Sequence, residues 1–263
     1  MNYDLAIERR RSVRTYTGEP LAAGVVTLLT DAIKKAPRPF GGDITLGLGR
    51  LDIKGPHKPG TYGMISEACD YMLAAFDERP ESALSTGFAL EDVVLRATDA
   101  GIGTCWIGGT FKGSDFAAAL DCPAPQSLKL IIAMGYPAGK ARFLERVGRK
   151  IMGSSGRKPF EELFFKKNTE TALERDNTFA DALAMMRLAP SSMNSQPWRA
   201  IVEGDTVHFY TVAKGPFRFV DLGIGLRHFA AHEESVGHSG NFMKLTAVPE
   251  APKSHEYVIS YRR

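Results

Sequence analysis

The sequence is poor in cysteine and has no long apolar run. Its three cysteines, Cys69, Cys105 and Cys122, are widely spaced and form no C-x-x-C pair, so neither a disulfide framework nor a zinc knuckle is predicted. We expect them to be reduced and buried. No segment approaches the roughly 20 apolar residues of a membrane-spanning helix. The first residues, MNYDLAIERRR, carry acidic side chains where a signal peptide needs an apolar core. These absences predict a cytoplasmic protein without a membrane partner.

An excess of charge of one sign is also missing. Lys and Arg number 33 against 30 Asp and Glu, and the basic residues are scattered, so no nucleic-acid partner is predicted. Six histidines include one pair at helical spacing, His228 and His232, followed by Glu233. A metalloprotease motif needs the glutamate directly after the first histidine. The pattern therefore favours a polar helix face, and no metal site is predicted.

What the sequence does contain is a weak internal repeat. Residues 32–37 (AIKKAP) and 185–190 (MMRLAP) each end an amphipathic stretch, and a strand-like run follows each of them. Residues 87–101 and 223–237 both run from glycine to glycine, and the glycine at the end is typical of a helix C-cap. Unrelated amphipathic helices can share this pattern, but two matched elements in the same order favour duplication. The apolar positions of the two helices are Leu90, Val93, Val94 and Ala97 in one, and Leu226, Phe229, Ala230 and Val236 in the other.

Further strands complete the two halves. Residues 44–48, 68–76 and 128–137 read as strands, and the unbroken apolar run of the last one favours a strand covered on both faces. Residues 199–212 predict a hairpin that turns at residues 203–205. The predicted fold class is α+β, a sheet with helices packed over it, built twice. Residues 1–165 form the first half and residues 166–263 the second, shorter half.

Two basic segments are candidate anion sites. RRRSVR at 9–14 follows a short predicted helix over 3–8, and its guanidinium groups and hydroxyl suit a phosphate. Alone, however, an arginine run is typical of a solvated surface. GRKPFEEL at 156–163 places a basic pair before a predicted helix that has Pro159 in its first turn.

Two other segments combine small and polar residues. APSSMNSQPW at 189–198 concentrates Ser, Asn and Gln between a predicted helix and a strand. That density suits a polyhydroxylated ligand, although Asx and Ser turns that end a helix use the same residues. GIGTCWIGG at 101–109 lets backbone N–H groups approach a ligand. It is not a dinucleotide-binding G-x-G-x-x-G, because Trp106 stands where the third glycine would be.

Together these segments resemble the nitroreductase family of FMN-dependent oxidoreductases. The family pattern is R-R-S-x-R, A-P-S-x-x-N-x-Q-P-W, G-x-G-T-C-W-I-G, G-Y-P and a late R-x-P-x-E-E. Residues 10–14, 189–198, 101–108, 135–137 and 157–162 match these motifs in that order. The order along the chain departs from the family, in which the Ser/Asn segment follows R-R-S-x-R by a few dozen residues.

Duplication accounts for this departure. The resemblance implies a homodimer with each flavin at the subunit interface, the Ser/Asn loop coming from the other subunit. Here residues 38–41 are Arg-Pro-Phe-Gly where residues 191–194 are Ser-Ser-Met-Asn, and the second half lacks R-R-S-x-R and G-T-C-W-I-G. Each half has lost what the other kept. The chain is therefore similar to fused nitroreductase-like proteins that form a pseudodimer, with one flavin site and a monomer as the expected state.

The resemblance also implies a set of site residues. Arg10, Ser12 and Arg157 or Lys158 would hold the FMN phosphate, and Arg14 would lie near the pyrimidine edge of the ring. The Gly108 N–H would face flavin N5, with the missing side chain leaving room for a stacked substrate. The implied cofactor-binding residues are Arg10, Arg11, Ser12, Arg14, Ile107, Gly108, Gly109, Arg157, Lys158, Pro190, Ser191, Ser192, Asn194 and Gln196.

No protein side chain is implied as a catalytic residue, and Cys105 is expected to serve packing. The implied activity passes a hydride from NADH or NADPH, a transient reductant, through flavin N5 to a small electrophilic acceptor in a ping-pong cycle. Residues 56–62 and 215–219 are the expected substrate loops. Two alternatives stay open: a flavin-binding or storage protein without turnover, and an anion-binding protein without flavin. The sequence specifies neither the acceptor nor the choice between NADH and NADPH.

Overall fold

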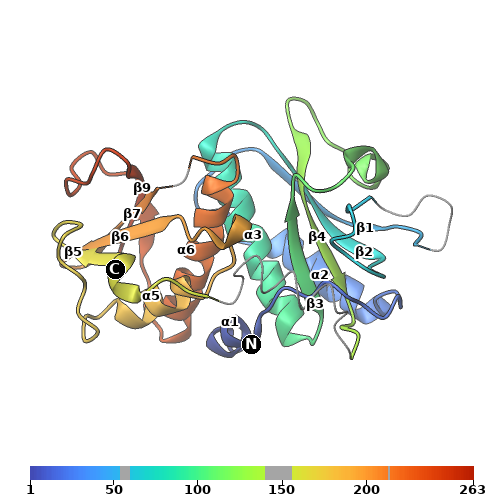
Figure 1. Cartoon of the computed structure of the whole chain (residues 1–263), viewed down its shortest axis with the longest axis horizontal. Helices are drawn as coiled ribbons and strands as arrows, with labels where there is room; N and C mark the ends of the chain where they lie inside the picture. The colour runs from blue at the N-terminus through green and yellow to red at the C-terminus, as the bar shows by residue number, and fades with distance from the viewer. Residues whose placement is uncertain (54–59, 140–155, 213) are drawn as a thin grey trace.

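The computed structural model describes residues 1–53, 60–139, 156–212 and 214–263. Two long helices, α3 and α6, lie side by side in the middle, with one sheet on each side of them (Figure 1). The helices are α1 (Tyr3–Arg9), α2 (Ala23–Lys35), α3 (Pro80–Asp99), α5 (Ala180–Arg187) and α6 (Arg218–Ser235). Short 3-10 turns cover Gly113–Asp115, Ala117–Ala119, Phe160–Glu162 and Ser192–Asn194. No helix in the described ranges combines the length and apolar character needed to cross a bilayer.

The two sheets share one topology. The first has the order β1-β2-β4-β3 and the second the order β5-β6-β7-β9-β8. Without β5, which adds a parallel edge strand, the second order repeats the first, and every other pairing is antiparallel. The strands are β1 (Ile44–Arg50), β2 (Asp70–Phe76), β3 (Gly103–Gly108), β4 (Ser127–Gly135), β5 (Phe164–Lys166), β6 (Trp198–Glu203), β7 (Thr206–Thr211), β8 (Asn241–Met243) and β9 (Glu256–Arg262). The prediction of an α+β fold built twice is confirmed, and β5 spans the predicted boundary at residue 165.

The crossing of α3 and α6 shows the same repeat at atomic scale. A Cβ on Gly87 would lie 2.1 Å from the carbonyl oxygen of Val220, and a Cβ on Gly223 would lie 2.2 Å from that of Leu84. Each contact is the reciprocal of the other, as in a two-fold interface between identical subunits. Only glycine lets the two backbones come this close, so Gly87 and Gly223 occupy equivalent places in the two halves.

Both central helices end as the sequence predicts. Gly101 and Gly237 have positive φ values of 76° and 79°, and the N–H of the residue after each glycine donates back to a carbonyl of the last turn. The predicted apolar stripe is buried in α3, and in α6 it is buried at Leu226, Phe229 and Ala230. Val236 was wrongly placed in it, because α6 ends one residue earlier and this side chain is 50% exposed.

Strand β4 lies in the interior of the first sheet and separates two parts of the core. Leu130, Ile132 and Met134 face the large core that includes α3 and α6, whereas Ile131 and Ala133 face a second cluster on the other side of the sheet. The predicted strand with two covered faces is confirmed. The predicted hairpin is also present, with a turn at Gly204 between β6 and β7.

Candidate functional site

The arginine-rich segment runs along the edge of the first sheet. After α1 the Arg10 N–H donates to the Ala6 carbonyl, and the chain turns away from the helix. Ser12 then forms a parallel bridge with Thr104 of β3, where the Val13 N–H donates to the Thr104 carbonyl at 2.9 Å. The segment is therefore held beside β3, at the start of the GTCWIG strand. Arg11 is exposed.

Arg10 is a buried cation. Its side chain is 6% exposed, and its Nε lies 3.8 Å from Oε1 of Glu91, too far for a hydrogen bond. The Nε atoms of Arg10 and Arg14 are both buried and have no hydrogen-bond partner among the described residues. Burial lowers the pKa of Arg10, and the Glu91 carboxylate opposes this change. Buried guanidinium groups with unused donors suit a bound anion.

The edge of β3 also offers backbone donors. Thr104 directs its carbonyl away from β4, because that oxygen accepts from Val13. Strand geometry alternates, so the backbone groups of Trp106 and Gly108 point to the same open edge. Ile107 instead pairs with Ile131 and is buried in the second core cluster. The predicted orientation of the Gly108 N–H toward a ligand is therefore compatible with the strand.

The space beside Gly108 is not free for a substrate. A Cβ on Gly108 would lie 2.9 Å from the Cε2 and Cζ atoms of Phe217, the residue before α6. The Phe217 ring thus fills the place that the missing side chain leaves, and the expected stacking of a substrate there stays a prediction that requires this ring to move. Gly108 permits close packing of the second half against β3. Gly109, which follows it, has a positive φ of 72°.

The Ser/Asn loop has a strained backbone held by its own side chains. Met193, Asn194 and Gln196 have positive φ values of 52°, 53° and 48°, an uncommon conformation for residues other than glycine. Ser191, which follows half-buried Pro190, accepts a hydrogen bond from the Gln196 N–H at its Oγ, at 2.9 Å. This hydrogen bond closes the loop and helps to hold its uncommon conformation.

The loop is anchored to α6 through a buried carboxyl group. The Ser192 N–H donates to Oδ1 of Asp221 at 2.9 Å, and Asp221 is 5% exposed in the first turn of α6. Burial raises the pKa of Asp221 to about 7, against the lowering effect of the Ser192 N–H. Phe217 lies one turn earlier and contacts Gly108, so the loop and the edge of β3 are brought to the same region.

The late basic segment docks on the Ser/Asn loop. Arg157 donates from Nη1 to Oδ1 of Asn194 at 3.1 Å, and the Lys158 N–H donates to Oε1 of Gln196 at 2.8 Å. Arg187 donates from Nε to the Lys158 carbonyl at 2.6 Å. The predicted helix after Pro159 is wrong: only a 3-10 turn forms over Phe160–Glu162, because β5 begins directly after it.

These interactions bring the two halves of the predicted site together. Burial lowers the pKa of Arg157, and the nearby positive charges of Arg10 and Arg187 lower it further. Arg10 comes from the start of the chain, whereas Arg157 is fixed to the Ser/Asn loop. Like charges gathered in a partly buried place repel one another, and a bound anion would offset this cost beyond what Glu91 does for Arg10. The donor set fits a phosphate group.

Sequence reasoning missed several residues of this region. Glu91 and His228 are fully buried in the two central helices, with His228 Nε2 lying 2.9 Å from Glu91 Oε1, so the predicted polar face is internal at His228. His232 contacts Asp4, and the described ranges contain no group of three side chains that could hold a metal ion. The available signal was the position of Glu91 itself, a charged residue beside the apolar stripe of α3.

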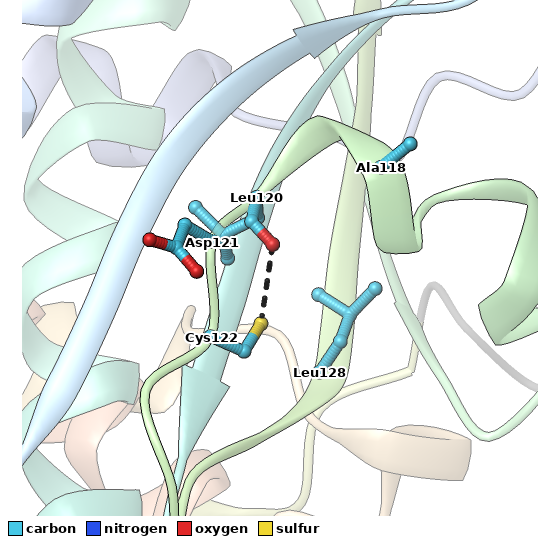
Figure 2. A pocket seen from close by; sticks show the side chains of 5 residues that line it. All are labelled: Ala118, Leu120, Asp121, Cys122 and Leu128. Atoms are coloured by element: carbon cyan, nitrogen blue, oxygen red, sulfur yellow. Dashed lines mark hydrogen bonds between the residues drawn. The ribbon is translucent and has the colours of Figure 1, made fainter.

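A hollow elsewhere on the first half does not belong to this site. It has a volume of about 510 Å³ and is lined by Ala118, Leu120, Asp121, Cys122 and Leu128 (Figure 2). Burial raises the pKa of the Cys122 thiol, with a further rise from Asp121, so this cysteine is not activated. Of the expected substrate loops, residues 56–59 lie outside the described part of the chain.

The equivalent place on the second sheet is filled by the protein itself. Phe40 of the loop after α2 packs edge-on against Phe88 of α3 and Phe242 of β8, with ring centroids 5.3 and 5.0 Å away. Phe242 lies at the same sequence distance from Gly237 as Trp106 does from Gly101. By the same spacing, Lys244 corresponds to Gly108 of the first half. We call Phe40, Phe88, Phe242 and Lys244 the filled region. Aromatic packing there replaces the cations and the open strand edge of the candidate site.

Comparison with known proteins agrees with this architecture. The solved structure of a "putative nitroreductase" from Thermotoga maritima has a TM-score of 0.63 and 22% identity, over 99% of this chain and 92% of that one. A nitroreductase family protein from Clostridium difficile 630 has a TM-score of 0.46 and 20% identity, over 62% of this chain and 96% of that one. A nitroreductase with bound FMN from Bacteroides fragilis has a TM-score of 0.42 and 19% identity, over 54% and 92%.

Among curated proteins nothing matches the chain. The sequence profile of a family described as "Putative TM nitroreductase" matches residues 3–232, a range that includes α1, α3, the Ser/Asn loop and most of α6. The first solved structure shares the fold over nearly its whole length. The chain belongs to this nitroreductase family.

Proposed function

We propose that this protein is an FMN-dependent oxidoreductase of the nitroreductase type that binds one FMN per chain. Arg10, Arg157 and Lys158 would hold the phosphate, with the Ser12 hydroxyl as a further donor. The Ser191 and Ser192 side chains would reach the ribityl chain. Arg14 would lie at the pyrimidine edge, where a cation stabilises a reduced, anionic ring. Family membership and the donor set of the site both support this assignment.

The observation that carries the proposal is the pair of cations formed by Arg10, whose side chain is buried, and half-buried Arg157. Arg10 and Arg157 come from different segments of the chain. Burial lowers the pKa of both guanidinium groups, because it disfavours their charged form. A phosphate dianion would neutralise both and would accept hydrogen bonds from guanidinium donors. Neither the hollow at Cys122 nor the filled region offers comparable groups.

The rest of the site suits a flat ring beside β3. The Gly108 N–H points to the open edge of the strand, where it can donate to a ring nitrogen. FMN bound here would supply, at its N5, the hydride chemistry that links NADH or NADPH to a small electrophilic acceptor in a ping-pong cycle. The two fused halves supply both sides of the site, so a monomer is sufficient.

The test compares FMN with riboflavin, which lacks the phosphate. Arg10→Ala removes charge-assisted hydrogen bonds worth about 1.5 to 3 kcal/mol each, so FMN affinity should fall at least about tenfold while riboflavin affinity changes little. Arg9→Ala is the matched control, because Arg9 is exposed at the end of α1. Fluorescence titration of apoprotein measures both affinities. Equal losses for the two ligands would show that Arg10 acts on folding and not on phosphate.

Turnover is tested separately from binding. The purified protein should show the two visible absorption bands of oxidised flavin, and NADH or NADPH should bleach them without oxygen. Bound flavin that neither nucleotide reduces would indicate a binding or storage protein. A colourless protein that FMN cannot reconstitute would leave an anion-binding protein without flavin and would refute the proposal.

A further inference from the structure

A fully buried polar cluster connects the proposed phosphate site to both halves of the chain. Glu91 of α3 is 0% exposed, and its Oε2 accepts a hydrogen bond from the Trp106 indole Nε1 at 2.9 Å. Its Oε1 lies 2.9 Å from Nε2 of His228 in α6 and 3.8 Å from Nε of Arg10. The cluster therefore joins the end of α1, the edge strand β3 and the two central helices.

The pseudo-two-fold gives this cluster a counterpart. One turn beyond Gly87 and Gly223 come the pairs Glu91-Asp92 and Arg227-His228. Glu91 contacts His228, and Asp92 makes the related contact with Arg227, with 3.0 Å between Oδ1 and Nε. Asp92 is equally buried, at 1% exposure. The two-fold thus relates two acid–base contacts, and the acidic partner lies on α3 in both of them.

The two acidic residues differ in what lies beyond them. Asp92 accepts hydrogen bonds from the Tyr3 hydroxyl and from Arg96, whose side chain is 41% exposed. Glu91 instead faces Arg10 and Trp106, which flank the proposed phosphate position and the open edge of β3. Removing Asp92 would disturb the helix interface and the contacts with Tyr3 and Arg96, whereas removing Glu91 would also disturb the two residues that flank the candidate site.

A fixed group of opposite charge helps to orient a buried guanidinium. Arg10 makes no hydrogen bond from Nε within the described residues, so its orientation depends on the Glu91 carboxylate and on packing. That carboxylate is itself fixed by Trp106 and His228, one partner from each half. Because it is 3.8 Å away and not hydrogen-bonded to Nε, it orients the guanidinium and leaves its donors available for another anion.

We propose that Glu91 is a positioning residue for FMN: it holds Arg10 in the orientation that binds the phosphate and fixes Trp106 beside Gly108. This inference rests on the proposed function. It has an opposing alternative, since a carboxylate this close to a phosphate could weaken FMN binding by repulsion. The two possibilities predict opposite signs for the removal of the charge.

The test measures the ratio of FMN affinity to riboflavin affinity in the full-length apoprotein. Glu91→Gln keeps the size and polar atoms of the side chain but removes its charge, and the ratio should fall about fivefold or more as Arg10 loses its orientation. Asp92→Asn is the matched control, with the same burial, helix and chemical change. It should lower the melting temperature without altering the ratio. Glu91→Asp, which keeps the charge on a shorter side chain, should give a ratio between those of the wild type and Glu91→Gln.

The outcomes separate this inference from the proposed function. If the wild type binds FMN no better than riboflavin and Arg10→Ala changes neither affinity, the proposed phosphate site is wrong. If the wild type discriminates through Arg10 but Glu91→Gln keeps or raises the ratio, only the positioning role is refuted. An equal fall of the ratio in Asp92→Asn would also refute it, because the effect would then belong to the helix interface as a whole.

Discussion

The candidate site and the filled region are built by the same topology and differ in what their loops carry. In the candidate site, the loop after α5 presents Ser, Asn and Gln side chains beside a strand edge that ends in Gly108. In the filled region, the loop after α2 inserts Phe40 against Phe88 and Phe242, beside β8, which ends at Met243, the residue before Lys244. The comparison shows that an aromatic residue at the loop tip and a lysine after the strand stand where the candidate site has Met193 and Gly108.

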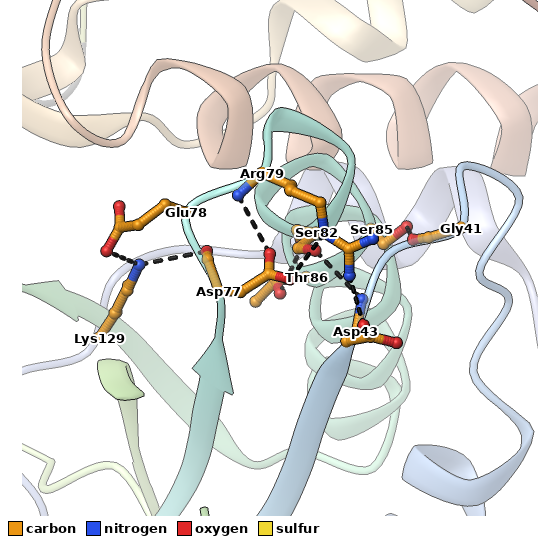
Figure 3. A network of polar contacts seen from close by, with 9 residues as sticks. All are labelled: Gly41, Asp43, Asp77, Glu78, Arg79, Ser82, Ser85, Thr86 and Lys129. Carbon is orange, nitrogen blue, oxygen red and sulfur yellow. Dashed lines mark hydrogen bonds and ion pairs between the residues drawn. The ribbon is translucent and has the colours of Figure 1, made fainter. Parts of the chain in front are cut away.

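The loop of the filled region is also tied down by contacts within its own half (Figure 3). Ser85 donates from Oγ to the Gly41 carbonyl at 2.6 Å, and the Asp43 N–H donates to Oγ of Ser82 at 3.1 Å. Gly42 has a φ of 85°, and a Cβ there would lie 2.6 Å from the Ser82 nitrogen. Arg79 pairs with both Asp43 and Asp77. Charges in this region are therefore neutralised by the protein, whereas at the candidate site Arg10 pairs with Glu91 at 3.8 Å and its positive charge lowers the pKa of Arg157.

The largest expected effect tests the two-fold crossing that relates the two regions. Gly87→Ala and Gly223→Ala should each destabilise the protein by about 3 kcal/mol or more, because the new Cβ would overlap a carbonyl oxygen of the other helix. Equivalent positions predict similar losses. Unfolding by urea gives the free energy of unfolding for both variants.

Gly24→Ala provides the control for these two substitutions. Gly24 is inside α2, and a Cβ there would meet nothing within 4 Å. Alanine favours helix by about 1 kcal/mol over glycine, so this variant should be slightly more stable than the wild type. Stabilisation by Gly87→Ala, or a large loss at only one of the two crossing glycines, would contradict the two-fold arrangement.

A smaller effect is expected from emptying the filled region. Phe40→Ala removes a half-buried ring and should cost about 2 to 3 kcal/mol of stability. Met193 holds the equivalent place in the Ser/Asn loop but is 77% exposed, so Met193→Ala should change stability by no more than about 0.5 kcal/mol. Titration of Phe40→Ala with FMN should still give one site per chain. A second FMN would show that Phe40 alone closes the filled region.

The sequence predicted the helices and strands of this molecule better than the contacts between them. Helix stripes, glycine caps and the hairpin follow from local periodicity and turn chemistry, and they were placed correctly apart from Val236 and the helix after Pro159. The R-R-S-x-R and Ser/Asn segments were recognised as motifs. The contacts between Glu91 and His228, or between Gly108 and Phe217, join residues far apart in the chain. Such pairs depend on the helix crossing, which no local pattern encodes.

The smallest expected effect is a pH dependence confined to the candidate site. Burial raises the pKa of Asp221 to about 7, from about 3.9 in an unfolded chain. The folded state therefore binds more protons than the unfolded state between about pH 4 and pH 7, so stability should fall as pH rises through this window and level off above it. Ser85 of α3 occupies the equivalent place in the filled region and does not titrate there.

Asp221→Asn isolates this contribution, because the amide oxygen can still accept from the Ser192 N–H. The variant should match the wild type near pH 5 and be more stable by about 1 to 2 kcal/mol near pH 8, where the wild type carries a buried carboxylate. Ser85→Ala, the control, should shift stability by the same amount at every pH. Free energies of unfolding at pH 5, 6, 7 and 8 decide the point. If the curves of Asp221→Asn and the wild type ran parallel, Asp221 would be ionised throughout this range. The Ser/Asn loop would then be anchored by a carboxylate whose ionisation does not change the free energy of unfolding between pH 5 and pH 8.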